Sequence, residues 1–339
     1  MPKSANPNPP SFDVARLAGV SRSAVSRAFT PGGTISPETR DKVTKAASEL
    51  GYRVNSLARG LQQRHSGIVG LVASRLDTPL RSRQVRLLSE ALIREGFKPM
   101  LITAEQPDDV SALIESLLGY RVAGMILTSD SPTRALIEDC KRLGLPVVLV
   151  NRAGVTNWGD RVVADNETGG QLAAKVLIDS GAMHLGCLVP KRKTYSVSGR
   201  SDAFLEAAAQ LGILPEVFYA EDQSYDDARA GINAADRAIL NRVDGLFCAT
   251  DLMALGALDA LRLDLGMAVP DQIQVLGFDD IEQASWASYN LSTIRQDIVS
   301  QAEIVVRLLI ERIADGTLVN RVERQPLTPV LRGTTRHDG

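Results

Sequence analysis

The stretch that decides the N-terminal fold is residues 14–29, which read VARLAGVSRSAVSRAF. Its apolar residues lie on one face of each of two short helices, and Gly19 separates the helices because glycine tolerates a positive φ. Ser21 can cap the second helix by accepting a hydrogen bond from a free backbone N–H. The polar face of that helix consists of Arg22, Ser23, Ser26 and Arg27. This pattern is typical of a helix-turn-helix, in which the second helix offers short polar and arginine side chains to the major groove of DNA.

A third helix is predicted after the turn at residues 31–33. Ser36 can cap it, Pro37 fits the first helical position, and Glu38 suits the positive end of the helix dipole. Apolar residues recur at helical spacing over 43–50, and Gly51 ends the helix. The side chains placed to contact DNA phosphates are those of Thr39, Arg40 and Lys42.

The charge is divided unevenly along the 339 residues. Residues 1–65 hold ten Lys and Arg but four acids, a net charge of +6, whereas the remainder carries −8. A basic head on an acidic body indicates a polyanionic partner for the head. Charge alone does not distinguish such a partner from a solvated surface.

From residue 66, short β-branched apolar runs alternate with helical stretches, which predicts parallel sheets with crossover helices. The strands are predicted at 68–73, 100–103, 124–128 and 147–151, and then at 184–189, 217–219, 245–249 and 275–278. The helices are predicted at 84–96, 108–120 and 132–144, and then at 167–180, 199–211, 225–240 and 251–265. Two similar halves indicate two doubly wound lobes with a ligand cleft between them, at the carboxyl ends of the strands.

Several classes of protein are disfavoured. No apolar run approaches the roughly 18 residues of a membrane span, and the polar N-terminus is no secretory signal, so a cytoplasmic protein is expected. The phosphate-binding, zinc-protease and nucleophile-elbow motifs of common enzymes are missing from the sequence. The three histidines are far apart, so we expect neither a metal site nor a cofactor. Three widely spaced cysteines are expected to be core residues: Cys140, Cys187 and Cys248.

The head resembles the N-terminal DNA-binding domain of LacI-type (lactose- and purine-repressor) transcription regulators. The residues that carry the resemblance are 14–21, 25–27, Ser36, 39–40, 42–43 and 50–52. The resemblance implies that Arg22, Ser23 and Arg27 contact base edges. It also implies a hinge helix over 55–61 that begins at Asn55 and inserts Leu61 into the minor groove. Two departures concern this hinge: Val54 replaces a usual proline, and Gly60 costs about 1 kcal/mol of helix stability.

The body resembles the effector-binding core of the same family, which has the fold of periplasmic sugar-binding proteins. The residues that carry this resemblance are 163–166, Gly169, Arg200, Phe204, 249–257, 269–271, 275–280 and 291–296. The resemblance implies three crossings between the lobes, near residues 164–165, 292–295 and 324–325. The predicted domains are therefore a head at 1–65 and a core at 66–339. Within the core, the first lobe comprises 66–164 and 294–324, and the second lobe 165–292 and 325–339.

By the same resemblance, a small effector would be bound by Ser74, Thr128, Asn151, Arg200, Thr250, Asp279 and Gln296. Arg200 and Asp279 together can hold sugar hydroxyls, although a structural salt bridge would also use them. Aromatic residues common in the family are replaced here, by Leu80-Arg81 and by Gln223. Arg81 and the basic run 191–193 favour an anionic effector such as a sugar acid or phosphorylated sugar, unless that run is only solvated.

The sequence therefore predicts a homodimeric repressor that binds a two-fold symmetric operator in double-stranded DNA under the control of a sugar-like effector. We expect a dimer because no heptad tail follows Arg332. A solute-binding protein would share the core but would have no use for residues 11–61. A sugar-modifying enzyme is the second alternative.

Overall fold

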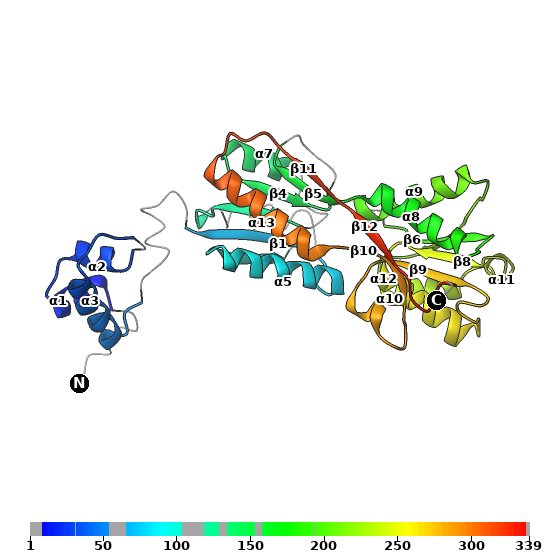
Figure 1. Cartoon of the computed structure of the whole chain (residues 1–339), viewed down its shortest axis with the longest axis horizontal. Helices are drawn as coiled ribbons and strands as arrows, with labels where there is room; N and C mark the ends of the chain where they lie inside the picture. The colour runs from blue at the N-terminus through cyan, green and yellow to red at the C-terminus, as the bar shows by residue number, and fades with distance from the viewer. Residues whose placement is uncertain are drawn as a thin grey trace. The chain divides into compact units, whose positions relative to one another are not determined.

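The computed structural model describes residues 9–30, 32–53, 66–103, 117, 119–128, 134–152, 158–192 and 194–336. The chain divides into two compact units, residues 1–66 and 67–339 (Figure 1). The predicted boundary after residue 65 differs from this division by one residue. The predicted hinge helix at 55–61, with Asn55 and Leu61, lies outside the described residues.

The first unit contains the three predicted helices. They are α1 (Ser11–Ala18), α2 (Arg22–Ala28) and α3 (Pro37–Leu50). Gly19 ends α1 with a φ of 66°, and the Ser21 Oγ accepts a hydrogen bond from the Ala24 N–H at 3.2 Å. The helices enclose a small core of Val14, Ala15, Val25, Ala28, Val43, Ala46 and Ala47. The helix-turn-helix prediction is therefore confirmed.

In the second unit, the described residues form two six-stranded sheets, one in each lobe. The strands of the first lobe are β1 (Ile68–Ala73), β2 (Lys98–Thr103), β3 (Gly124–Leu127), β4 (Val147–Val150), β5 (Asp160–Ala164) and β11 (Val322–Gln325). Their order is β11-β5-β4-β3-β1-β2, and all of the pairs are parallel. The helices are α5 (Pro79–Arg94) and α13 (Ile298–Ala314), which pack together, and α7 (Arg134–Arg142).

The second lobe repeats this topology. Its strands are β6 (Leu185–Pro190), β7 (Glu216–Ala220), β8 (Gly245–Cys248), β9 (Gln274–Asp279), β10 (Ser292–Gln296) and β12 (Leu327–Val330). Their order is β12-β10-β9-β8-β6-β7, and only the pair of β10 with β12 is antiparallel among those described. The helices are α8 (Asn166–Asp179), α9 (Tyr195–Gln210), α10 (Tyr225–Asn233), α11 (Arg237–Leu240) and α12 (Asp251–Asp259).

Both sheets are covered on their two faces, as the doubly wound prediction requires. In the first lobe, α5 and α13 bury Leu88 and Leu309 against one face, and α7 buries Ile137 against the other. In the second lobe, α10 and α12 cover one face while α8 and α9 cover the other, where Phe204 stacks on Phe247. The three cysteines are buried and free, so the prediction that they are core residues is confirmed.

The chain passes between the lobes three times (Figure 1). The crossings are at Asp165, between β5 and α8; at Asp297, between β10 and α13; and at Pro326, between β11 and β12. The predicted lobe boundary at 294 was therefore wrong by three residues. Ser292–Gln296 pairs with β9 and β12 and so belongs entirely to the sheet of the second lobe.

Four of the predicted helices differ from those observed. The predicted helix 225–240 is two helices, because the Asp236 side chain accepts hydrogen bonds from backbone N–H groups and caps α11. The helix predicted at 84–96 begins earlier, at Pro79, and the helix predicted at 199–211 begins earlier, at Tyr195. After Asp259, α12 continues as a π-helical turn, Ala260–Asp264. The helix predicted at 108–120 lies mostly outside the described residues.

Candidate functional site

The exposed face of α2 carries the predicted base-contacting residues. Arg22, Ser23 and Arg27 are exposed, whereas Ala24 and Val25 are buried in the core of the head. The helix therefore presents the amphipathic pattern that its sequence predicted, and both arginines are accessible to a polyanion.

The three predicted phosphate contacts differ in their surroundings. Lys42 is exposed, and its Nζ lies 2.8 Å from the Glu38 Oε1. The Thr39 Oγ1 shares a hydrogen bond with the Ser36 Oγ at 2.7 Å. Arg40 instead turns toward the loop after α2, where its guanidinium donates to the carbonyls of Ala28 and Gly33. Arg40 therefore braces this loop, a role that the sequence analysis did not predict.

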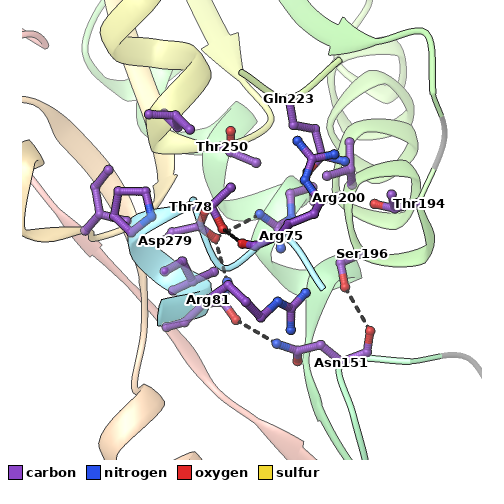
Figure 2. A pocket seen from close by; sticks show the side chains of 16 residues that line it. Arg75, Thr78, Arg81, Asn151, Thr194, Ser196, Arg200, Gln223, Thr250 and Asp279 are labelled. Atoms are coloured by element: carbon purple, nitrogen blue, oxygen red, sulfur yellow. Dashed lines mark hydrogen bonds and ion pairs between the residues drawn. The ribbon is translucent and has the colours of Figure 1, made fainter. Parts of the chain in front are cut away.

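A cleft of about 750 Å³, including its open mouth, lies between the two lobes of the second unit (Figure 2). Five of the seven predicted effector residues line it: Asn151, Arg200, Thr250, Asp279 and Gln296. Ser74 and Thr128 are buried at the ends of β1 and β3 and are not among the lining residues. The Thr128 hydroxyl donates to the Val72 carbonyl at 3.3 Å, so it is used by the sheet.

Arg200 is held in the second lobe by three hydrogen bonds and by an aromatic ring against its guanidinium. Its Nη1 donates to the Ala249 carbonyl at 3.0 Å and to the Asp279 Oδ1 at 3.1 Å, and its Nε donates to the Asn166 Oδ1 at 3.2 Å. The guanidinium carbon lies 3.7 Å from the centre of the Phe278 ring. Because the Arg200 side chain is only 4% exposed, its charge depends on Asp279 for compensation.

A chain of polar groups leads from Asp279 into the first lobe. The Asp279 Oδ1 accepts from the Gln296 Nε2 at 2.6 Å, and the Gln296 Oε1 accepts from the Asn151 Nδ2 at 3.5 Å. Ser196 also reaches across, because its hydroxyl donates to the Asn151 carbonyl at 3.2 Å. Asn151 and Asp279 both have positive φ, 54° and 127°; Asn151 directly follows β4 and Asp279 is the last residue of β9, so the chain bends where these strands end.

The sequence analysis missed Arg75, which connects the lobes. Arg75 follows β1 with a φ of 55°, and its Nη1 lies 2.8 Å from the Asp222 Oδ1 of the second lobe. Burial alone would raise the pKa of Asp222, but the hydrogen bonds from Arg75 and from the Gln223 N–H, together with the charges of Arg75 and Arg192, outweigh it and hold that pKa below its usual value. The position of Arg75 just after a strand was a usable signal, whereas its partner is 147 residues away in the sequence.

Asp251 supports the floor of the cleft from behind. Its Oδ1 accepts from the Thr293 hydroxyl at 2.5 Å, and its Oδ2 accepts from the Ile281 N–H at 2.9 Å. The carboxyl is fully buried. Burial and the neighbouring charge of Asp279 raise the pKa of Asp251 to about 7.

Asp251→Asn should make the core less sensitive to pH. Because the pKa of Asp251 is higher in the folded chain than in the unfolded chain, its stabilising contribution is complete below about pH 4 and is lost as the pH rises through 7. The free energy of unfolding of the variant, relative to wild type, should rise by about 1.4 kcal/mol per pH unit between pH 5 and 7. Urea unfolding at several pH values measures this difference. Parallel pH profiles of the two proteins would contradict the assignment.

Comparison with known proteins gives the same division of the chain. Residues 12–55 match the family of bacterial regulatory proteins, lacI family, and residues 174–335 match a periplasmic binding protein-like domain. The transcriptional regulator MalR of Streptomyces coelicolor is 30% identical over 310 residues, 89% of each chain. The transcriptional repressor PurR of Vibrio vulnificus is 29% identical and covers 96% of this chain and 98% of its own.

Solved structures show the same architecture. The lac repressor dimer bound to operator and the anti-inducer ONPF is 25% identical, with a TM-score of 0.87 over 97% of this chain and all of that one. The complex of the regulator CelR with cellobiose is 30% identical, with a TM-score of 0.69 over 96% of this chain and all of that one.

A helix-turn-helix head together with a two-lobed, cleft-bearing core defines a ligand-responsive transcription regulator, not an enzyme. The chain belongs to the lacI family of bacterial regulatory proteins. No helix in the described part of the chain is both long and apolar enough to span a membrane.

Proposed function

We propose that this chain is a cytoplasmic repressor that binds a two-fold symmetric operator in double-stranded DNA as a homodimer. A sugar-like effector, bound between the lobes of the core, controls this binding. The observation that carries the proposal is the presence, in one chain, of the exposed Arg22 and Arg27 of α2 and of a polar cleft bridged between two lobes. A transport solute-binding protein would have the cleft but would have no use for the head.

In the head, Arg22, Ser23 and Arg27 contact base edges. The phosphates are contacted by Thr39 and Lys42, and also by Arg40 when its guanidinium releases the loop carbonyls that it binds here. Asn55 and Leu61 of the hinge segment complete the DNA-binding set. A single α2 offers few base contacts, and a two-fold operator pairs with a two-fold dimer. The lac repressor structure, solved as a dimer on its operator, supports this assembly.

In the core, the effector contacts Asn151, Arg200, Thr250, Asp279 and Gln296, with Ser74 and Thr128 nearby at the ends of their strands. These groups donate and accept hydrogen bonds as sugar hydroxyls require. Relatives include a ribose operon repressor of Lactococcus lactis and a sucrose operon repressor of Pediococcus pentosaceus. They support a sugar or sugar derivative as the class of effector.

The control follows from the bridges between the lobes. Contacts between described residues join the two lobes. They include the ion pair of Arg75 with Asp222, the side-chain hydrogen bond of Asn151 with Gln296, and the hydrogen bond of the Ser196 hydroxyl with the Asn151 carbonyl. A ligand among these groups favours one closure of the lobes over another by its differential affinity for the two states. Closure is transmitted to residues 55–61, which connect the core to the head.

Arg27→Ala and Lys42→Ala should separate base recognition from phosphate binding. Arg27→Ala should weaken specific binding by about 1–3 kcal/mol and relax preference at one base position. Lys42→Ala should weaken binding to all sequences alike and lower the salt slope by about one unit. The measurement is fluorescence anisotropy with an operator selected from random duplexes by the full-length protein.

Arg16→Ala is the matched control, because Arg16 is an exposed arginine of the head that lies on α1, outside the proposed contacts of α2 and α3. Light scattering of the same complex should give two protomers per operator. The proposal fails if no duplex is selected. The division of roles fails if the Arg27 and Lys42 variants behave identically on selected and random DNA.

A further inference from the structure

The contacts between the lobes lie at different distances from the chain crossings. The crossings leave from β5 and β11, at one edge of the first sheet, and from β10, which lies with β12 at one edge of the second sheet. Asn151 follows β4, beside β5, and Gln296 ends β10, so their hydrogen bond lies near the crossings. Arg75 follows β1 and Asp222 follows β7, toward the opposite edges of the two sheets. Their ion pair therefore joins the lobes on the side away from the crossings.

Any opening of the lobes about the crossings has to separate Arg75 from Asp222. In a hinge motion, each point moves in proportion to its distance from the hinge, so groups near the far edges separate most. The Arg75 Nη1 and the Asp222 Oδ1 are 2.8 Å apart, and a small rotation about the crossings takes them beyond hydrogen-bond distance. The bond between Asn151 and Gln296, nearer the crossings, is already long at 3.5 Å. The ion pair is therefore the contact that opposes opening most directly.

The turn after β1 holds Arg75 in the position that this ion pair requires. Its φ of 55° lies in the left-handed region, which is unfavourable for a residue with a side chain and persists where the surrounding structure fixes it. The Arg75 carbonyl accepts two hydrogen bonds from Thr78, from the N–H at 3.1 Å and from the hydroxyl at 2.9 Å. Figure 2 shows Arg75 beside Thr78 at the cleft. The guanidinium is thus presented to the second lobe by an ordered turn.

The carboxylate of Asp222 is also held in place before it meets Arg75. Its Oδ1 accepts a hydrogen bond from the Gln223 N–H at 2.7 Å, in the loop between β7 and α10. Despite its burial, its pKa lies below the usual value, so the group is ionised at neutral pH. The charge of Arg192, in the same lobe, also acts on Asp222. Of the contacts described for this carboxylate, only that with Arg75 crosses between the lobes.

We propose that Arg75 and Asp222 form a latch that holds the lobes closed over the effector site and is released whenever the effector enters or leaves. The two side chains are 26% and 33% exposed, so the latch should change the ratio of closed to open protein by about two- to fivefold. A latch of this modest strength can be released by a ligand that binds one closure of the lobes better than another. This inference rests on the proposed function, because the site that the latch closes is the effector site.

The test measures opening through a cysteine placed in the wall of the cleft. Val197 lines the cleft from α9 and is 4% exposed, so the thiol of Val197→Cys should react with a maleimide only when the lobes open. When closing is fast relative to labelling, the labelling rate of the full-length protein is proportional to the open fraction. Peptide mass spectrometry reads each cysteine separately. The fully buried Cys187 and Cys248 report unfolding of the same lobe.

In the Val197→Cys protein, Arg75→Gln and Asp222→Asn should each raise the labelling rate about two- to fivefold. The double variant should label no faster than either single variant, because the second change has no partner left to remove. The asparagine keeps an oxygen that can accept from the Gln223 N–H, so its local turn is retained. The labelling rates of Cys187 and Cys248 should stay at their wild-type values.

Arg229→Gln is the matched control. Arg229 pairs with Asp264 at 2.6 Å, the two side chains are 38% and 27% exposed, and both lie within the second lobe. The loss of this ion pair should leave the labelling rate of the Val197→Cys thiol unchanged.

The latch is overturned if either single variant labels at the wild-type rate, if the two effects multiply in the double variant, or if Arg229→Gln labels equally fast. Faster labelling of Cys187 and Cys248 would also overturn it, because the lobe would then be unfolding. Operator selection on the same preparations separates the two proposals. Unchanged labelling with retained operator binding defeats only the latch, whereas failure to select any operator defeats the proposed function.

Discussion

Arg200→Ala should abolish the response of DNA binding to the effector. The guanidinium touches Asp279, Asn166, the Ala249 carbonyl and the Phe278 ring, and it lines the cleft. If the effector is an inducer, the variant should stay bound to operator at every concentration of the probe, which is the sugar or sugar derivative that binds the wild-type protein most tightly. If the effector is a co-repressor, the variant should stay weakly bound throughout. One titration of operator anisotropy against the probe separates these cases.

The same change should also destabilise the second lobe. Removal of Arg200 leaves Asp279 buried without its compensating charge, and breaking such a pair costs about 3–5 kcal/mol. Urea unfolding of the core reports this loss. Arg200→Lys retains the charge but loses the planar fork, so it offers a folded variant in which the effector response is still impaired. A variant that keeps the wild-type midpoint for the probe would show that Arg200 is only structural.

Asp160→Ala should be the most destabilising change in the first lobe. The Asp160 carboxylate is fully buried and receives the Nε and Nη2 of Arg312 at 2.9 and 2.8 Å and the Nη2 of Arg321 at 3.0 Å. These bonds join β5, α13 and the start of β11. Alanine would leave the buried Arg312 uncompensated, at a cost of about 3–5 kcal/mol by urea unfolding.

The exposed pair Arg86–Glu90 supplies the control, because Glu90→Ala should change stability by about 1 kcal/mol or less. Burial alone would raise the pKa of Asp160, but the hydrogen bonds from Arg312 and Arg321 outweigh it and hold that pKa below its usual value. The stability that Asp160 provides is therefore present above about pH 4 and is lost as the pH falls through its lowered pKa. Equal losses in the Asp160 and Glu90 variants would contradict this account.

Local signals in the sequence were sufficient for most of the fold. Runs such as Ile68–Ala73 predict buried strands because they are apolar and β-branched, and Gly19 and Ser21 mark the turn of the head. The break at Asp236 was missed because its neighbours continue a helical pattern, and only the capping bond of its side chain ends that pattern. The lobe boundary at Asp297 was missed because it depends on which sheet Ser292–Gln296 joins. Pairing with a strand from another part of the chain decides this, not the local sequence.

The site was predictable where residues match positions of the family that the sequence resembles, and unpredictable where partners are distant. Asn151, Asp279 and Gln296 were predicted from that resemblance, and they line the cleft. The roles of Arg75 and Arg40 depend on contacts with Asp222 and with loop carbonyls, which no local pattern reveals.

The three crossings mean that neither lobe is a continuous piece of chain, and this bears on how the protein is made. During translation, β1 to β5 leave the ribosome early, but α13 and β11 follow only after β6 to β10. Until α13 arrives, the face of the first sheet that it covers, including Val69 and Leu71, lacks its partner helix. A chain that ends before Ile298 would cover this apolar face with α5 alone, and incompletely covered apolar surfaces aggregate. Residues 298–330 complete both sheets, so neither lobe can reach its final packing before they are synthesised.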